Sequence, residues 1–435
     1  MHRRAFLSTA TAAAVISNAK PADGSDRPVR NQPLRASYWG SQYYDDKERE
    51  QLMDVVNNQS PFRWYGKVQP LKVVTFEKEF AQRMGTRYAL AVTSGTAALQ
   101  CAVNALEIGF GDEVILPAWT WHSCYTAILL AGGLPVFAEI DESFNIDPAD
   151  IEHRITPQTK AIMAVHLQGN PADLDRILPI ARKHNLRVIE DCAQSVGASY
   201  KGRPVGSIGD IGIYSLQLNK TITAGEGGAV VTNDPVLFER ASRFHDLGAL
   251  RPVHKQIVGE ERLSTFAGCN FRMSEFTGGV LLAQIRKVDR IIEDVRSNAR
   301  RVYEGVSDLP GIRLRRLPDP AGELGTGVYM DFQNKERRDR FIALMKAENV
   351  PASPPSGSAI LPVQAYIENK VTIHPAWPTF HSERGKAIRY GAASCPRTIE
   401  IHDRFGGVLM DPKFTKRDTD DIVAAIRKVY PKVAA

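Results

Sequence analysis

The sequence has no run of about 18 or more apolar residues, which is the length that a membrane-spanning helix needs. Its cysteines number only five and include no C-x-x-C pair. A zinc site and a disulfide framework are therefore not expected, and the cysteines are predicted to be small buried side chains. Neither G-x-x-x-x-G-K-[ST] nor G-x-G-x-x-G occurs in a suitable context, which argues against those nucleotide-binding loops.

An excess of positive charge is also missing from most of the chain. The formal net charge is +6, but the first 30 residues hold five basic residues against two acidic ones. Half of the net charge therefore lies in a short tail, and the rest of the chain is close to neutral. This distribution does not support nucleic-acid binding.

The N-terminal tail has features of its own. Residues 1–20, MHRRAFLSTATAAAVISNAK, contain the pair Arg3-Arg4, a short apolar stretch and small residues near Asn18. This pattern resembles a twin-arginine export signal, and the alternative is a disordered tail with a chance arginine pair. The polar stretch 20–35, with several prolines, is expected to be a linker.

The full sequence has 43% hydrophobic residues, which is typical of a globular protein, and it is long enough to bury a cofactor. Longer segments with a helical apolar period, such as 95–106 and 174–185, alternate with short apolar runs, and the pattern predicts a mostly parallel sheet covered on both faces. A single long helix is expected from Met273 beyond Val302, and a closing helix near 419–430. The predicted strands are 88–92, 113–118, 134–140, 160–166, 186–191, 210–216 and 227–233.

The strongest chemical signal lies in the segment 191–228. Asp191 ends a predicted strand, where open α/β sheets bind ligands, and Lys220 follows it within YSLQLNKTITAGEGG. A lysine that forms a Schiff base with pyridoxal 5′-phosphate (PLP) needs a partly desolvated amine. A carboxylate that faces the pyridine nitrogen keeps this nitrogen protonated. Asp191 and Lys220 are therefore the candidate catalytic residues of a PLP enzyme.

Two further segments follow predicted strands. In VTSGTAAL, Ser94, Gly95 and Thr96 open a helix, whose N-terminal N–H groups and hydroxyls could bind a phosphate. The alternative is a plain helix cap. In PAWTWHS, Trp121 could stack on a flat ring or could be a core aromatic. No ligand spacing accompanies the histidines, so no metal site is expected.

Together these segments resemble the DegT/StrS family of PLP-dependent sugar aminotransferases. The resemblance covers about residue 36 to the end and includes EDCAQSVGASYKGRPVGSIGD and CNFRMSEFTGGVLLAQI. It implies a fold type I PLP-dependent transferase, an α/β protein with a seven-stranded, mostly parallel sheet. The expected parts are a tail and linker (1–35), a large PLP-binding domain (36–272), and a linking helix with a small α+β C-terminal domain (273–435).

The resemblance also implies roles for residues. Lys220 would form the Schiff base, Asp191 would face the pyridine nitrogen, Gln194 would bond the ring oxygen and Trp121 would stack on the ring. Asn270 would reach the phosphate in the neighbouring subunit of a homodimer. The phosphate of the same subunit would be held by Ser94, Gly95, Thr96 and Ser215.

The implied reaction moves an amino group from glutamate or glutamine to a keto-sugar or keto-cyclitol, which could be nucleotide-linked. Lys220 favours transamination, because relatives with histidine at this position act as dehydratases. The alternatives are a PLP-binding protein without turnover and a PLP-dependent dehydratase or lyase. Substrate specificity is expected in loops that include 249–268 and 351–375. The family suggests a cytoplasmic enzyme, whereas the tail suggests export.

Overall fold

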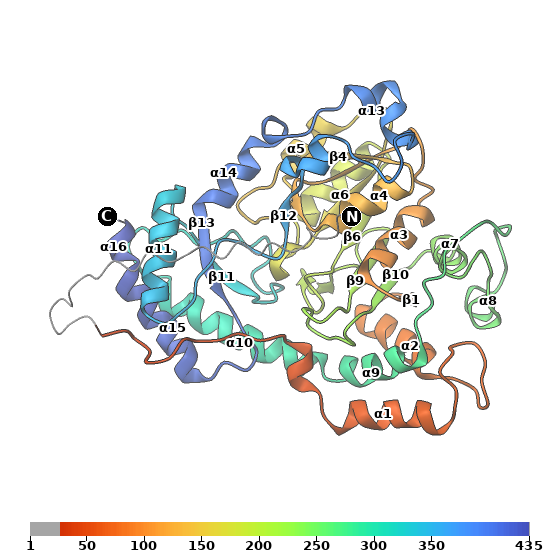
Figure 1. The fold of residues 1–435 in the computed structure, drawn as a ribbon, viewed down its shortest axis with the longest axis horizontal. Coiled ribbons are helices and arrows are strands. Elements are labelled where there is room, and N and C mark those ends of the chain that lie inside the picture. The colour runs from red at the N-terminus through yellow and green to blue at the C-terminus, as the bar shows by residue number, and fades with distance from the viewer. Residues whose placement is uncertain (1–26, 435) are drawn as a thin grey trace, which may run out of the picture.

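The computed structural model describes residues 27–434, and its centre is a seven-stranded sheet (Figure 1). The strand order is β1-β10-β9-β6-β5-β2-β4. Each strand overlaps one of the seven segments predicted from the sequence. The bounds are β1 Tyr88–Val92, β2 Glu113–Pro117, β4 Leu134–Ala138, β5 Thr159–Val165, β6 Arg187–Asp191, β9 Ile211–Ser215 and β10 Gly228–Thr232.

The direction of the strands decides where functional side chains can meet. Strands β4, β2, β5, β6 and β9 pair in parallel, and β10 pairs antiparallel with both β9 and β1. Strand β1 therefore runs in the same direction as β9 and β6. The carboxyl ends of these three strands lie at one edge of the sheet, and the prediction of a mostly parallel sheet is confirmed.

Helices cover both faces of the sheet. Ala89 and Ala91 of β1 belong to the core under α2 and α9, whereas Leu90 and Val92 belong to the core under α3 and α7. This alternation is the period of two that an extended strand imposes. The helices of this part are α1 Asp46–Asn57, α2 Lys72–Met84, α3 Gly95–Ala105, α4 His122–Leu130, α5 Pro148–Arg154, α6 Leu174–Lys183, α7 Pro235–His245, α8 Pro252–Val258 and α9 Glu275–Ile285.

The C-terminal part is smaller and of α+β type, and it lies beside the sheet (Figure 1). Its strands β11 (Gly327–Asp331) and β13 (Phe405–Leu409) pair antiparallel. Its helices are α10 Val288–Val306, α11 Lys335–Ala347, α14 Pro396–Arg404, α15 Lys416–Val429 and α16 Pro431–Ala434, whereas α12 Ala365–Glu368 and α13 Glu383–Ala387 belong to a segment that packs against the large sheet.

Short elements complete the fold. Two small antiparallel pairs join β3 with β12 and β7 with β8. Their bounds, with those of the 3₁₀ helices, are β3 Trp119–Thr120, β7 Ser199–Tyr200, β8 Arg203–Pro204, β12 Ala359–Ile360, η1 Gly40–Tyr43, η2 Leu167–Gly169, η3 Leu361–Val363, η4 Pro378–His381 and η5 Ala392–Ser394.

The long helix predicted from Met273 onward is wrong in its continuity. Helix α9 ends at Ile285 and α10 begins at Val288. At the break, the ammonium of Lys287 donates to the carbonyl oxygen of Tyr43 at 2.8 Å and to the Glu48 carboxylate at 2.7 Å. No glycine or proline marks the break, so the local sequence carried no signal for it.

The second half of the expected linker is packed rather than free. Leu34 is buried, and its N–H donates to the carbonyl oxygen of Asn349 at 2.9 Å. Arg30 forms ion pairs with Asp418 at 2.9 Å and Asp421 at 2.6 Å. The described start of the chain is therefore fastened to the C-terminal part. The twin-arginine motif lies outside the described residues.

A segment from the C-terminal third of the chain lies on the sheet rather than beside it (Figure 1). Strand β12 pairs with β3 in the loop after β2. The indole N–H of Trp377 donates to the carbonyl oxygen of Leu129 at 3.0 Å, and the Tyr390 hydroxyl donates to that of Pro135 at 2.7 Å. This segment brings chain from beyond residue 350 close to the carboxyl edge of the sheet. Within residues 27–434, no helix is long and apolar enough to cross a membrane.

Candidate active site

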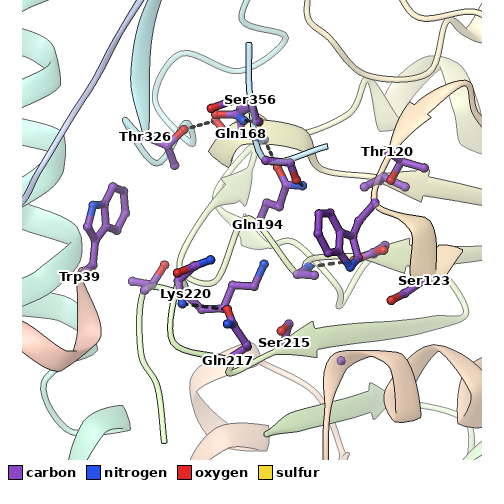
Figure 2. A pocket seen from close by; sticks show the side chains of 18 of the residues that line it. Trp39, Thr120, Ser123, Gln168, Gln194, Ser215, Gln217, Lys220, Thr326 and Ser356 are labelled. Carbon is purple, nitrogen blue, oxygen red and sulfur yellow. Dashed lines mark hydrogen bonds between the residues drawn. The ribbon is translucent and has the colours of Figure 1, made fainter. Parts of the chain in front are cut away.

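A cavity of about 570 Å³ opens at the carboxyl ends of β1, β6 and β9. Its volume lies in the range of sites for small molecules and cofactors. Side chains from the sheet, from the N-terminal segment and from the C-terminal part line the cavity and converge in Figure 2. Eight of the nine residues predicted from the sequence line it: Ser94, Gly95, Thr96, Trp121, Asp191, Gln194, Ser215 and Lys220.

The turn between β1 and α3 forms one end of the cavity. The Ser94 hydroxyl caps α3 by accepting the N–H of Ala97 at 3.1 Å. A Cβ atom on Gly95 would stand 2.7 Å from the Cβ of Ser215, so only glycine fits here. Gly228 is equally constrained, because its Cβ would be 2.2 Å from the carbonyl oxygen of Ser94. These close contacts bring a helix N-terminus and several hydroxyls together, which suits a phosphate.

Asp191 ends β6 and is 2% exposed. Its carboxylate accepts the N–H of Ala193 at 2.9 Å and the thiol of Cys124 at 3.1 Å. Burial raises the pKa of Asp191, while these two hydrogen bonds and the charge of Lys220 act in the opposite direction. Burial raises the pKa of the Cys124 thiol well above its usual value, so this group stays a proton donor.

Lys220 lies in the loop between β9 and β10, and its side chain points into the cavity (Figure 2). The loop folds back on itself, since the N–H of Lys220 donates to Gln217 at 3.0 Å and that of Ala224 to Leu216 at 3.2 Å. Burial lowers the pKa of Lys220, and the charge of Asp191 opposes this effect. Within residues 27–434, the ammonium has no hydrogen-bond or ion-pair partner. The side-chain nitrogen of Lys220 is therefore desolvated and, among these residues, is not held by a hydrogen bond or an ion pair.

Trp121 is 54% exposed and lines the cavity, so it is not a core residue. It lies at the N-terminus of α4, where its ring meets that of His122 edge to face at 5.5 Å. Nearby, the hydroxyls of Thr96 and Ser123 are hydrogen-bonded at 2.7 Å. An exposed aromatic face at a cavity wall is available to a flat ligand.

Asn270, the ninth predicted residue, is not among the residues that line the cavity of its own chain. It is exposed, and its backbone forms an isolated β-bridge with Asp246. The side-chain oxygen accepts the N–H of Arg272 at 3.4 Å. Its contact with a neighbouring subunit stays a prediction.

Several cavity residues were not found from the sequence. Cys124 was predicted only as a small buried side chain; it is buried, and its thiol also donates to Asp191. Of the two loops expected to hold specificity, 351–375 contributes Ser356 and Gly357 to the cavity and 249–268 contributes no residue to it. No local pattern separates these residues from ordinary loop or core positions. The others that line the cavity include Trp39, Gln168, Thr326 and Met410.

One buried group among the described residues has the composition of a metal site: His166, Glu190 and Cys192. Its atoms are already hydrogen-bonded. The Nδ1 of His166 accepts the N–H of Ala172 at 2.9 Å, so the proton is on Nε2, which lies 3.0 Å from Glu190. Glu190 also accepts the N–H of Gly206 at 2.8 Å. Because these atoms already have hydrogen-bond partners, we interpret the group as structural support for β6, the strand that ends at Asp191.

Comparisons with known proteins agree with this geometry. Residues 44–427 match the model of the DegT/DnrJ/EryC1/StrS aminotransferase family. A GDP-perosamine synthase of Escherichia coli O157:H7 is 42% identical over 235 residues, covering 54% of this chain and 63% of that protein. An L-glutamine:2-deoxy-scyllo-inosose aminotransferase of Micromonospora echinospora is 39% identical over 261 residues, covering 57% of this chain and 62% of that protein.

The chain thus spans less than two thirds of the length of these two relatives. Among solved structures, an aminotransferase from Psychrobacter cryohalolentis is similar with a TM-score of 0.76 and 29% sequence identity. The match covers 92% of this chain and 100% of that one. The similarity therefore extends over the sheet and the C-terminal part together.

Proposed function

The chain belongs to the DegT/DnrJ/EryC1/StrS aminotransferase family, a family of PLP enzymes, and we propose that it moves an amino group from glutamate or glutamine to a keto-sugar or keto-cyclitol. The fold predicted from the resemblance is confirmed. The observation that carries the proposal is the placement of Lys220, Asp191 and the Ser94–Thr96 turn around one cavity.

The residues of this cavity fit PLP in three respects. Glycine at position 95 lets the N-terminus of α3 approach Ser215, so that Ser94, Thr96 and Ser215 lie together where a phosphate would bind. The amine of Lys220 has no partner within the described residues. The buried carboxylate of Asp191 would face a ring nitrogen. We therefore assign phosphate binding to the turn, covalent attachment to Lys220 and ring-nitrogen contact to Asp191.

PLP supplies, when bound, an aldehyde and an electron-withdrawing pyridinium ring. The chain supplies the proton chemistry around it. Lys220 would hold the cofactor, and its amine, whose pKa burial lowers, would carry a proton to or from the substrate carbon. Asp191 would keep the ring nitrogen protonated, and the Cys124 thiol holds the carboxylate in place by its hydrogen bond. Trp121 would stack on the ring, and Gln194 would lie near the ring oxygen.

The acceptor is proposed from the relatives. One is named for a GDP-sugar product and the other for a deoxy-inosose substrate. Both names describe polyhydroxylated six-membered rings, and a carbonyl on such a ring is the acceptor we propose. The enzyme is proposed to act as a homodimer, in which Asn270 reaches the phosphate of the neighbouring subunit.

Two half-reactions test the proposal. PLP-loaded protein mixed with L-glutamine or L-glutamate is expected to lose the visible absorbance of the cofactor. Adding a keto-sugar or keto-cyclitol then restores this absorbance and yields an aminated product by mass spectrometry. A protein that binds PLP but passes neither step is a binding protein. Product that forms without an amino donor indicates a dehydratase or lyase.

A further inference from the structure

Gln168 has a backbone conformation that few side-chain-bearing residues adopt. In η2, directly after β5, its φ is 54° and its ψ is 42°, which is the left-handed region. This conformation costs roughly 1–2 kcal/mol for a residue other than glycine. It persists only where the surrounding structure holds it. The conformation of Gln168 therefore depends on its contacts with the surrounding residues.

The C-terminal part of the chain holds Gln168 on both its backbone and its side chain. Its carbonyl oxygen accepts the hydroxyl of Thr326 at 2.6 Å and the buried guanidinium of Arg315 at 3.2 Å. Its side-chain oxygen accepts the Tyr329 hydroxyl at 3.0 Å, and its side-chain nitrogen donates to the carbonyl oxygen of Ser356. Gln168 is 7% exposed, so these polar groups depend on protein partners.

Gln168 in turn fixes the amide of Gln194. Its backbone N–H donates to the Gln194 side-chain oxygen at 3.0 Å, which leaves the amide nitrogen pointing the other way. That nitrogen donates to the Ser358 hydroxyl at 3.0 Å and to the Gly357 carbonyl oxygen at 3.3 Å. Because the backbone N–H can only donate, the orientation of the Gln194 amide is determined. Figure 2 shows Gln168, Thr326 and Ser356 next to Gln194 above the cavity.

We propose that Gln168 is a positioning residue that holds the Gln194 side chain in one orientation at the wall of the cavity, so that the C-terminal part sets cofactor affinity through Gln168. The proposal rests on the proposed function, since it assumes that Gln194 contacts PLP. It differs from a direct contact of Gln168 with the cofactor. A residue that acts only through Gln194 has no effect once the Gln194 side chain is gone.

A double-mutant cycle separates these cases. The variants are Gln168→Gly, Gln194→Ala and the double variant. The glycine keeps the backbone N–H and tolerates positive φ, but it loses the bonds to Tyr329 and Ser356. The measurement is the dissociation constant of PLP from titration of the apo-protein. A second measurement is the pH midpoint of the visible absorbance of the bound cofactor.

We expect Gln168→Gly to raise the dissociation constant about fivefold, the factor of one neutral hydrogen bond. The double variant should match Gln194→Ala alone, and both single variants should move the absorbance midpoint in the same direction. The proposal is overturned if the two effects multiply in the double variant, or if Gln168→Gly leaves both readouts unchanged.

Gln333→Gly is the matched control. Gln333 is also a glutamine at positive φ, 68°, but it is exposed and lies outside the cavity. Its replacement should leave PLP binding unchanged, and an equal loss of affinity there would contradict the proposal. Tyr329→Phe, which removes a single hydroxyl, serves if Gln168→Gly does not fold, and its effect must also vanish in the Gln194→Ala background. Failure of the wild type to aminate its cofactor would contradict the proposed function instead.

Discussion

At the residue scale, burial acts on the two charged groups of the cavity in opposite directions. It lowers the pKa of Lys220 and raises that of Asp191, so it favours the neutral form of each group. Each charge opposes the effect of burial on the other. A neutral amine is a nucleophile, and a carboxylate that keeps its charge depends on the hydrogen bonds from Cys124 and Ala193. Burial therefore favours the reactive neutral amine of Lys220, whereas the hydrogen bonds to Asp191 oppose the effect of burial on its carboxylate.

Replacing Lys220 by alanine should abolish attachment of PLP and lower turnover by at least about 10²-fold, because the amine is also the proton carrier. Borohydride treatment of wild-type protein, followed by peptide mass spectrometry, should find the label on Lys220. The exposed Lys201 offers a control, and its alanine variant should be labelled like the wild type. A label on any other lysine would remove Lys220 from this role.

The Asp191→Asn variant should lose turnover by about 10²-fold or more while its dissociation constant for PLP changes little. An amide has no charge to keep the ring nitrogen protonated, although it preserves the shape of the side chain. Steady-state kinetics and a PLP titration separate the two effects. Turnover within a few-fold of the wild type would exclude Asp191 from the mechanism.

The third change at this scale is Trp121→Ala. Its half-exposed ring supports little of the core, so the variant should keep its melting temperature. PLP binding should weaken by on the order of 1 kcal/mol, the usual value of an aromatic stacking contact. Equilibrium dialysis of the cofactor measures this loss. Unchanged retention of PLP would mean that the ring does not stack on it.

At the scale of elements, the site depends on the register of three strands. Val92 of β1, Gly228 of β10 and Ser215 of β9 lie side by side across the sheet. This register places the N-terminus of α3 against the end of β9, with glycine at each close approach. A shift of one residue in any of these strands would separate Ser94 from Ser215.

Gly95→Ala tests this arrangement. The new Cβ would stand 2.7 Å from that of Ser215, so the turn and the strand must move apart. We expect PLP affinity to fall about tenfold or more, because the turn would lose contacts with the phosphate. Loss of one pair of hydrogen bonds would produce a change of this size. Gly109→Ala is the control, because nothing lies within 4 Å of a Cβ there and its φ is not positive. Equal affinities of the two variants would exclude a phosphate at this turn.

At the scale of the whole molecule, the proposed dimer would complete each site with a residue from the second copy of the chain. Small residues such as the paired glycines of α9 allow close contact between helices. In the structure they serve contacts within the chain, since a Cβ on Gly278 would meet Val73 and one on Gly279 would meet Gln51. The proposal of a dimer therefore depends on Asn270, which is exposed and outside the cavity of its own chain.

Complementation between subunits tests this proposal. A mixture of the inactive variants Lys220→Ala and Asn270→Ala, unfolded and refolded together, should regain activity. A mixed dimer would hold one intact site, with Lys220 from one copy and Asn270 from the other. Each variant refolded alone is the control, and light scattering reports the mass. No gain of activity in a mixture that forms mixed dimers would place the action of Asn270 within its own chain.

The sequence by itself determined the sheet and the centre of the site. The seven strands were predictable because a buried parallel strand is a short apolar run, and this pattern is local. Lys220, Asp191 and Ser94 were predictable because each follows or ends such a strand. The break between α9 and α10 was not, since it depends on contacts of Lys287 with Tyr43 and Glu48.

Only the tertiary structure decided which distant segments close the cavity. Trp39, Cys124, Gln168 and Ser356 come from four parts of the chain, and none stands in a pattern that differs from an ordinary loop or core position. The same holds for Leu34, which packs against Asn349 although its segment has the composition of a linker. Local periodicity specifies which face of an element is buried. It does not specify which polar groups, hundreds of residues apart, meet once that face is covered.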